Sequence, residues 1–306
     1  MWIDEYEKLM FRFENTEEKK LKAVQLKYDN MPDLCYKYRR VSDNTLDAFE
    51  KDILYFSAIS TFNDPFECAM SLSYEQIREQ SYDIVLNKLK TFLIPGFKLN
   101  PEDYLTQDTL VNKITKGFIV PLEDQGEIKC LWKMTDDLIR METIKIGKET
   151  SLIGDDIYRV CSFSEANDSL LMWAHYSDNH QGFCLGYNFK EANDDLTELM
   201  LPVIYSDDLL EISKYMFPNI NNSLIMNAIT RKSKAWEYEK EWRIVTLANG
   251  SGKSQQQKVP VPKCVYLGAR IGEKERNQII EIASKKNIDI YQLQIESDKF
   301  SLYVRK

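Results

Sequence analysis

The segment from Trp236 to Val245 carries the densest set of side chains that could do chemistry. Side chains alternate between the two faces of a strand, so an extended chain from Glu239 onward places Glu239, Glu241 and Arg243 on one face. Such a row is costly to bury without partners, and it is therefore either a solvated face or a prepared polar site. Paired carboxylates beside a cleft can position a substrate hydroxyl and stabilise positive charge. Glu239 and Glu241 are accordingly the candidate catalytic residues.

The two histidines, His175 and His180, flank a second candidate region that includes Tyr176. Their spacing of five residues does not place both on one helix face. A zinc site also requires further ligands at suitable spacing, so no metal site is predicted. His175 could be a general acid or base because imidazole titrates near neutral pH, and a structural role fits it equally well. His180 is interpreted as a hydrogen-bonded histidine that closes a helix end.

Loop carboxylates form a third group of candidates. Asn63 and Asp64 sit in a turn-forming run that Glu67 closes, because Asn and Asp bond their own backbone and Pro65 restricts the dihedral angle. Functional groups often sit on such loops, so the structural and functional interpretations both stay open. Glu165 ends a strand-like run in which Ser162 and Ser164 face either water or a cleft.

Periodicity indicates which elements must position these residues. Short apolar or aromatic runs predict strands, and three-to-four-residue spacing predicts helices. The predicted strands are residues 34–39, 53–57, 157–163, 182–189, 201–205, 241–247, 264–267, 288–295 and 300–304. The predicted helices are residues 43–51, 168–176 (with Asp168 as the cap), 207–232 and 272–286. Strands and helices are segregated rather than alternating, so the predicted fold class is α+β with a mixed or antiparallel sheet.

The domain organisation follows from the same pattern. Residues 1–30 are expected to form an N-terminal helical extension, and residues 31–306 a single α+β domain. A mostly helical stretch at about 72–150 is interpreted as an insertion into that domain, as a lid or a partner surface. The Gly-, Ser- and Gln-rich residues 249–258 are expected to be a loop between strands.

Composition narrows the class of protein. The chain has 306 residues, a formal net charge of -8 and ordinary hydrophobic and charged fractions of 43% and 29%. An acidic chain is a poor candidate for general nucleic-acid binding, and the basic run 231–234 is interpreted as a solvated face. No apolar run approaches the roughly 20 residues of a membrane span. The six cysteines show no disulfide or metal-binding spacing, and no signal segment is recognised. We therefore expect a cytoplasmic location and no membrane partner.

One short motif is set aside. Gly250–Ser254 ends like a phosphate-binding P-loop, but Leu247 stands where the upstream glycine is required. A P-loop also leads into a helix, whereas Gln255–Gln257 leads to Val259-Pro260. We interpret the segment as a polar loop.

Seven short motifs together resemble a bacterial family of unknown function, DUF2971. They are Tyr36–Arg39, Leu54–Ser57, Phe62–Glu67, Cys161–Glu165, Met172–Tyr176, His180–Gly182 and Trp236–Arg243. The resemblance extends from about Leu34 to Leu267, with the helical middle as its variable part. It implies no activity, although the family's occurrence near mobile elements and phage-defence genes implies a defence or toxin-like role.

A second resemblance is to ADP-ribosyltransferases, which share an Arg on the first strand, an aromatic residue and Ser on a later strand, and a late Glu-x-Glu. Arg39, the pair Tyr55 and Ser57, and the pair Glu239 and Glu241 follow this order. The resemblance implies a split β core that binds NAD, with Arg39 on a phosphate, Ser57 on the nicotinamide ribose and a Glu stabilising an oxocarbenium-like transition state. The residues expected to bind NAD are then Arg39, Tyr38, Ser57, Tyr55, Tyr176 and Arg243.

Three functions remain open from the sequence. The first is an ADP-ribosyltransferase or NAD-hydrolysing enzyme. The second is a metal-dependent hydrolase or nuclease that uses Asp64, Glu67, Glu165, His175 and Glu239, since carboxylates suit hard cations. The third is a non-enzymatic sensor or binding module in which the arginines are buried in ion pairs. The partner, whether a nucleotide, a protein or a nucleic acid, stays open.

Overall fold

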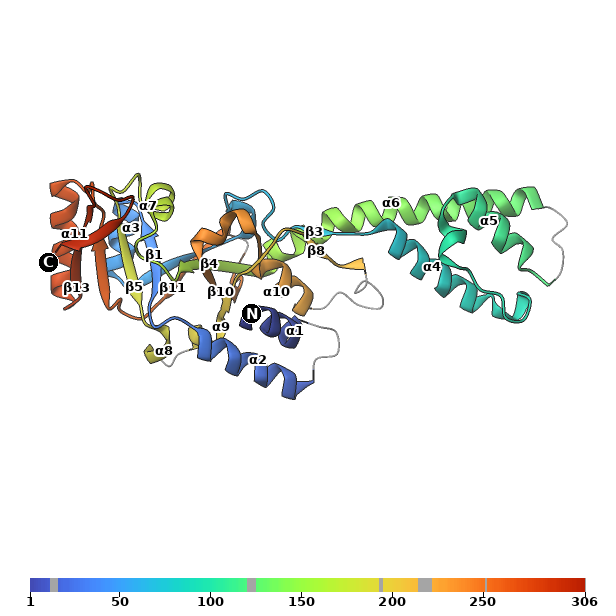
Figure 1. The fold of residues 1–306 in the computed structure, drawn as a ribbon, viewed down its shortest axis with the longest axis horizontal. Helices are drawn as coiled ribbons and strands as arrows, with labels where there is room; N and C mark the ends of the chain where they lie inside the picture. Colours follow the sequence, from blue (N-terminus) through green and yellow to red (C-terminus); the bar gives the residue numbers. More distant parts are fainter. Residues whose placement is uncertain (12–15, 120–124, 193–194, 214–221, 251, 306) are drawn as a thin grey trace. The chain divides into compact units, whose positions relative to one another are not determined.

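The computed structural model describes residues 1–11, 16–119, 125–192, 195–213, 222–250 and 252–305. The chain divides into two compact units (Figure 1). Unit 1 comprises residues 1–68, 154–208 and 225–306, and unit 2 comprises residues 69–153 and 209–224. Unit 2 overlaps the insertion expected at about 72–150, and the predicted domain boundaries stay a prediction. No helix in the described part of the chain is both long enough and apolar enough to span a membrane.

Unit 1 is built on one large, mainly antiparallel sheet. The main strand order is β11-β2-β4-β1-β5-β12-β13-β14, and β10 pairs with β4 and with β6. The strands are β1 Cys35–Arg39, β2 Ile53–Ser57, β4 Tyr158–Ser164, β5 Phe183–Tyr187, β6 Met200–Pro202, β10 Glu241–Leu247, β11 Ser254–Lys258, β12 Cys264–Leu267, β13 Asp289–Ile295 and β14 Leu302–Arg305. Among the described residues of this sheet, only β12 and β13 pair in parallel. The predicted α+β class with an N-terminal helix is confirmed.

The sheet splits beside β4. One edge of β4 pairs with β10 along its whole length, from Glu241 opposite Ser164 to Leu247 opposite Tyr158. The other edge meets β2 only at Val160 and β1 only at Ser164. The backbone of β4 between these two points therefore has no strand partner on that side, and side chains can reach it there.

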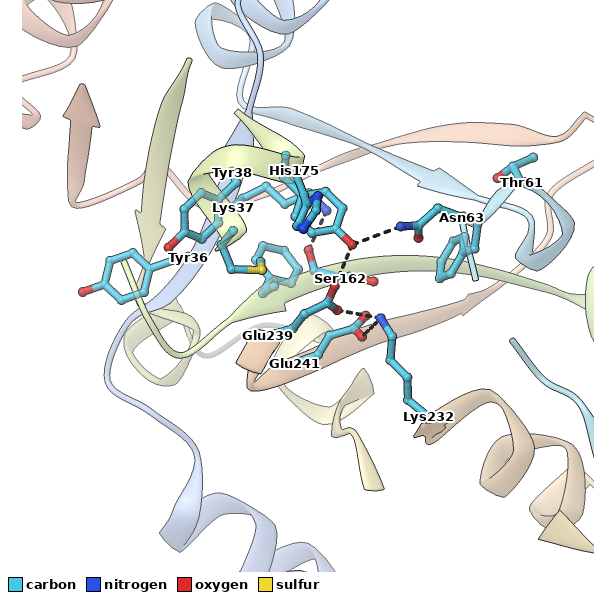
Figure 2. Close-up of a pocket in the computed structure, with 14 residues that line it drawn as sticks. Tyr36, Lys37, Tyr38, Thr61, Asn63, Ser162, His175, Lys232, Glu239 and Glu241 are labelled. Carbon is cyan, nitrogen blue, oxygen red and sulfur yellow. Dashed lines mark hydrogen bonds and ion pairs between the residues drawn. The ribbon is translucent and has the colours of Figure 1, made fainter. Parts of the chain in front are cut away.

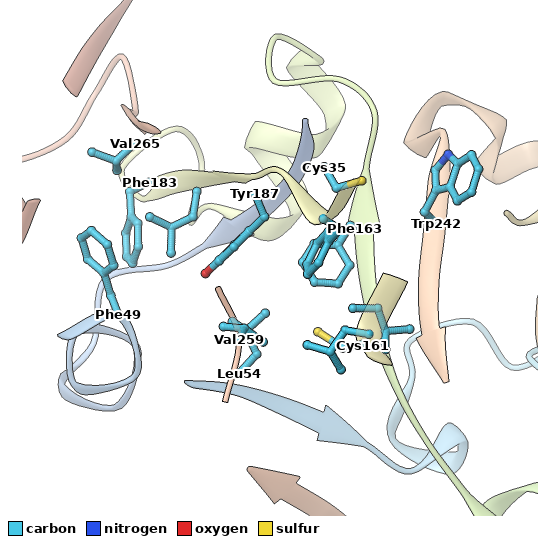
Figure 3. Close-up of a cluster of buried hydrophobic side chains, with 14 of the residues drawn as sticks. Cys35, Phe49, Leu54, Cys161, Phe163, Phe183, Tyr187, Trp242, Val259 and Val265 are labelled. Carbon is cyan, nitrogen blue, oxygen red and sulfur yellow. The ribbon is translucent and has the colours of Figure 1, made fainter. Parts of the chain in front are cut away.

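Helices cover both faces of the sheet in unit 1. The helices are α1 Trp2–Phe11, α2 Glu17–Asn30, α3 Asp43–Glu50, α7 Leu170–Tyr176, α8 Phe189–Ala192, α9 Asp195–Leu199 and α11 Glu273–Lys285. Aromatic and aliphatic side chains of α3, α11 and the central strands form one core cluster (Figure 3). On the opposite face, Trp173 of α7 packs edge-on against Tyr38, with ring centroids 5.2 Å apart.

The N-terminal helices support the back of β10. Trp2 stacks on Trp242 with centroids 6.1 Å apart and planes 20° apart. Trp242 and Ile244 are almost fully buried in the core, as strand alternation predicted. The neighbouring positions of β10, Glu241 and Arg243, consequently face the other way.

Unit 2 is mostly helical. Its elements are β3 Met70–Ser71, α4 Tyr74–Lys88, α5 Gln107–Lys116, most of α6 Gln125–Ile157 and β8 Leu210–Glu211. Its apolar core gathers Tyr82, Leu110, Ile114 and Trp132. Apolar positions recur along α5 at helical spacing, which explains why α5 buries Leu110 and Ile114 on one side.

Three local predictions are wrong. The helix expected over 207–232 is instead β8, α10 (Asn222–Thr230) and β9 (Arg231–Ser233), with residues 214–221 outside the described part. The loop expected at 249–258 contains the edge strand β11, whose polar glutamines show no apolar alternation to detect. Ser169, not Asp168, caps α7, because its hydroxyl accepts from the Met172 amide.

Candidate functional site

One cavity of unit 1 brings together six of the candidate site residues named from the sequence (Figure 2). They are Tyr38, Asn63, His175, Tyr176, Glu239 and Glu241. Its volume is about 400 Å³. It lies beside the split in the sheet, between β1, β4, α7, the 61–63 segment and the chain around β9 and β10. The lining residues are Tyr36, Lys37, Tyr38, Thr61, Phe62, Asn63, Ser162, Phe163, Met172, His175, Tyr176, Lys232, Glu239 and Glu241.

A tight turn brings Glu239 beside Glu241. Glu239 ends the 3-10 helix η5 (Lys234–Glu239), and Lys240 adopts a left-handed conformation with φ of 44°. The Ser164 hydroxyl donates to the Glu239 carbonyl at 2.6 Å and anchors the turn to β4. Strand β10 begins at Glu241, as its predicted bounds of 241–247 have it, so the extended conformation considered from Glu239 onward does not include Glu239. The turn nevertheless places both carboxylates at the cavity.

Glu241 is held by two cations. Arg243 donates from Nε to Glu241 Oε1 at 2.9 Å and from Nη2 to Oε2 at 3.0 Å. Lys232 donates to the same Oε2 at 2.9 Å. Burial raises the pKa of Glu241, but the charges of Arg243 and Lys232 outweigh burial and lower that pKa to about 2. Glu241 is therefore ionised at neutral pH.

Arg243 also donates two parallel hydrogen bonds to the Glu67 carboxylate. The Nη1–Oε2 and Nη2–Oε1 distances are 2.8 and 2.9 Å, the fork geometry that suits a guanidinium and a carboxylate. Arg243 donates further to the Ile229 carbonyl. The side chain of Arg243 is 1% exposed, and its pKa is raised because the two glutamates outweigh its burial. The expectation of arginine buried in ion pairs with Glu241 and Glu67 is confirmed for Arg243.

Glu239 has a different environment from Glu241. Lys232 donates to Glu239 Oε2 at 2.6 Å, and the Tyr176 hydroxyl donates to Oε1 at 2.6 Å. Burial raises the pKa of Glu239, and the negative charge of Glu241 raises it further. The positive charge of Lys232 lowers this pKa, but the net shift is upward. The pKa values of the two neighbouring carboxyl groups are thus shifted in opposite directions.

We call Glu67, Lys232, Glu239, Glu241 and Arg243 the charge network. All five side chains are 4% exposed or less. With every group ionised, three carboxylates face two cations, so one carboxylate is in excess. A proton on Glu239 removes this excess, which agrees with the direction of its pKa shift.

Aromatic rings and one lysine form the rest of the wall. Tyr36, Tyr38, Phe62 and Phe163 contribute apolar surface. Lys37 crosses the split and donates to the Ser162 carbonyl, which has no strand partner on that side of β4. Burial lowers the pKa of Lys37. His175 is exposed and lines the cavity.

Four residues expected to bind NAD, namely Arg39, Tyr55, Ser57 and Arg243, do not line this cavity. Arg39 is half-buried at the end of β1, and its Nη2 is buried without a partner among the described residues. The Tyr55 hydroxyl accepts from Gln256 on β11, and Ser57 pairs with Ser254 on the same strand. Strand β2 meets β4 only at the pair Ser57 and Val160, and neither Tyr55 nor Ser57 is in the lining.

Two of the predicted carboxylates hold backbone or core groups. Glu165 accepts from the Trp242 indole at 2.8 Å, and Trp242 points away from the cavity face of β10. Asp64 accepts from the Phe66 amide at 2.9 Å and shapes the turn. Within the described ranges, no group of three or more His, Cys, Asp or Glu is placed to hold a metal ion.

His180 has a structural environment. It stacks on Trp173, with centroids 6.5 Å apart, and its φ of 71° follows two other left-handed residues, Asp178 and Asn179. Asn, Asp and His are the side chains that adopt this region most readily after glycine. Burial lowers the pKa of His180, and the charge of Arg270 lowers it further.

Two charged cavity residues, Lys232 and Lys37, were missed by sequence reasoning. Lys232 belongs to the basic run expected to be solvated, yet β9 pairs with β7 (Ile204–Ser206) and directs Lys232 inward. Lys37 can reach the Ser162 carbonyl only because the sheet splits beside β4. Strand alternation within 231–233 is the one signal that separates Lys232 from its exposed neighbour Ser233, and three residues are too few to detect it.

Comparison with known proteins covers part of this site. Residues 172–244 match the model of a family described as a protein of unknown function (DUF2971). The matched segment includes Tyr176, Lys232, Glu239, Glu241 and Arg243, but not β1 or Glu67. It is shorter than the resemblance expected from 34 to 267. No curated protein and no solved structure matches the chain.

Proposed function

We propose that the cavity is the active site of an enzyme that breaks the bond between a sugar and a base, in a substrate of the nucleotide class that includes NAD. The observation that carries this proposal is the position of Glu239 and Glu241 together at the cavity, within a buried network that holds one carboxylate more than it has cations. The raised pKa of Glu239 agrees with this excess, because the other four groups of the charge network balance one another. Pairs of carboxyls with pKa values driven apart are typical of acid–base chemistry at glycosidic bonds.

The charge network suits the charge that develops in this reaction. Breaking a glycosidic bond leaves positive charge on the sugar in the transition state. When Glu239 gives up its proton, the network carries one net negative charge beside that sugar. The five groups are shielded from water, where such stabilisation is strongest.

The cavity has the size and walls for one nucleoside unit. Its volume of about 400 Å³ lies within the roughly 300–1,000 Å³ of small-molecule sites. Tyr36, Tyr38 and Phe163 offer aromatic surface to a flat base. Asn63 and Ser162 also line the cavity and offer polar contacts.

NAD enters this proposal as a donor of ADP-ribose. Transfer to another molecule and hydrolysis by water both begin with loss of nicotinamide, so the same carboxylates serve either outcome. The ADP-ribosyltransferase resemblance gave roles to Arg39, Tyr55 and Ser57, and these roles are not part of the proposal because those residues lie outside the cavity lining.

Base release from purified protein tests the proposal. The protein is incubated with NAD and with a panel of nucleosides and nucleotides, and released base is measured by chromatography. We expect Glu239→Gln to lower the rate about 10²–10⁴-fold for the substrates whose base is uncharged and leaves with a proton. Glu237→Gln, an exposed neighbour, is the matched control and should leave the rate unchanged. Expression of the same variants in bacterial cells tests the toxin-like role in phage defence that we also propose.

A second candidate function is ligand binding without chemistry. The observation that favours it is the saturation of Glu67 and Glu241, whose oxygens all contact Arg243 or Lys232. Calorimetric binding of a nucleotide with no base released, in wild type and Glu239→Gln alike, would establish this function in place of the enzyme.

A further inference from the structure

The hydroxyl of Tyr176 lies between Glu239 and a second polar side chain of the cavity. It donates to Glu239 Oε1 at 2.6 Å and accepts from Asn63 Nδ2 at 3.4 Å. The other oxygen of Glu239 is occupied by Lys232. Both carboxylate oxygens of Glu239 are thus bonded, and its side chain is 4% exposed.

Tyr176 is more accessible than Glu239. It is half-buried, whereas Glu239 is buried, and both line the cavity. Figure 2 shows Asn63 and Glu239 on two sides of the cavity, joined through this hydroxyl by dashed lines. A ligand in the cavity can therefore contact the Tyr176 hydroxyl while the hydrogen bond from Lys232 to Glu239 stays in place. The turn that positions Glu239 also stays in place.

Building on the proposed function, we propose that Tyr176 passes the proton of Glu239 to the departing base, and that the substrate therefore carries an uncharged purine or pyrimidine. Tyr176 is the catalytic residue in this step because it touches the base. Glu239 acts through it as the proton source, and Asn63 is a positioning residue that holds the hydroxyl by donating to its oxygen.

The proton balance closes with water as the only co-reactant. The bond from the sugar carbon to the base nitrogen breaks, and its electron pair stays on that nitrogen. For this step the hydrogen bond between the two residues reverses: the protonated Glu239 donates to Tyr176 Oη, and the Tyr176 hydroxyl donates to the base nitrogen. The nitrogen takes the proton of Tyr176 Oη, which takes the proton of Glu239 in the same event. Water then adds to the sugar carbon, and the proton it loses returns through Tyr176 to the Glu239 carboxylate.

A concerted transfer fits the acidity of the tyrosine. Burial raises the pKa of Tyr176, and its hydrogen bond and proximity to Glu239 raise it further. Tyr176 therefore stays protonated over the neutral range and does not act as a free tyrosinate. The hydroxyl donates its own proton and accepts another in a single step, as a proton relay does.

The need for a proton separates two classes of substrate. The nicotinamide of NAD is cationic while attached and departs as a neutral molecule, so its loss needs no acid. An uncharged purine or pyrimidine departs as an anion unless it is protonated. A site with a proton source and a relay beside the bond gains rate only with the second class, by the general rule for acid catalysis.

Paired substrates test the relay in Tyr176→Phe. Adenosine needs a proton on its leaving base, whereas a nitrophenyl riboside, with a good leaving group, does not. We expect Tyr176→Phe to lower kcat for adenosine about 10²–10⁴-fold and to change the nitrophenyl riboside rate less than about threefold. A structural role for Tyr176 would lower both rates equally, and that result would overturn the relay.

A measurement on the wild type keeps the test valid if Tyr176→Phe does not fold. The relay moves two protons together, so adenosine cleavage should slow in heavy water with a curved dependence on deuterium content, and riboside cleavage should not. A linear or absent dependence for adenosine would overturn the relay. No turnover of either substrate or of NAD would instead reject the proposed function itself.

Discussion

Each unit of this protein buries charged side chains, and the two clusters differ in their balance. In unit 2, Arg78 donates from Nε to Asp136 at 2.6 Å and from Nη1 to the Tyr104 carbonyl at 2.7 Å. One cation meets one carboxylate there, and neither residue lines a described cavity of unit 1 or unit 2. In unit 1, the charge network holds one carboxylate more than it has cations, and it opens on a cavity.

The difference separates a structural ion pair from a prepared site. A balanced, closed pair such as Arg78–Asp136 can do no more than hold its helices in place. An unbalanced network has to adjust its protonation, and Glu239, the group whose pKa is raised, lies at the cavity together with Glu241 and Lys232. Burial alone does not identify a site, because all these charged side chains are at least nine-tenths buried.

The largest expected effect comes from removing one cation from either cluster. We expect Arg243→Met and Arg78→Met each to lower the free energy of unfolding by about 3–5 kcal/mol, because each leaves buried carboxylates without a partner. Urea unfolding followed by fluorescence measures the loss. Trp132 is the tryptophan of unit 2 and the other four belong to unit 1, so Trp132→Phe separates the two signals.

Arg243→Lys and Arg78→Lys serve as matched controls, since each keeps the charge and loses the fork. The Lys variants should lower the free energy of unfolding by less than the Met variants do. A cost below about 1 kcal/mol for Arg243→Met would mean that the network is solvated like a surface pair, and the comparison would fail.

A smaller effect is expected from acid on unit 1. The pKa of Glu241 is lowered from its ordinary 4.5 to about 2, so its ionised form favours the folded state. This stability is present above about pH 4.5 and is lost as the pH falls toward 2, to a total of about 3 kcal/mol. Glu239 opposes it, because a raised pKa adds stability as the pH falls. Stability is measured by urea unfolding across this range.

Glu239→Gln sharpens the acid test by removing the opposing group. In this variant the loss between pH 4.5 and 2 should persist, while any gain on lowering the pH toward 4.5 should disappear. A stability that stays flat below pH 4.5 in both proteins would show that Glu241 gains nothing from Arg243 and Lys232.

The smallest effect is expected from replacing the whole pair in unit 2. Arg78→Met with Asp136→Leu removes both charges, and such swaps are often neutral or stabilising. We expect the double variant to unfold within about 1 kcal/mol of wild type or to be more stable, with base release unchanged. A change in base release would contradict the view that Arg78 and Asp136 are purely structural.

Local patterns predicted most of the elements of unit 1. Strands β1, β2, β10 and β12 and helix α11 lie within one or two residues of their predicted bounds, because their apolar alternation or spacing is strong. Prediction failed at β11 and β9, whose residues are polar and whose strand state depends on pairing with β2 and β7. The boundaries of the helical insertion and the roles of the site residues stay predictions.

The sequence by itself determined which strand face of β10 is polar, since alternation ties Glu241 and Arg243 to one side and Trp242 to the other. Tertiary structure alone decided which partners those residues meet. Glu67 and Arg243 lie 176 positions apart, and only the folding of the sheet brings them into contact. The same folding carries Lys232 inward and leaves Arg39 outside the cavity, because position in space depends on long-range strand pairing that no local pattern encodes.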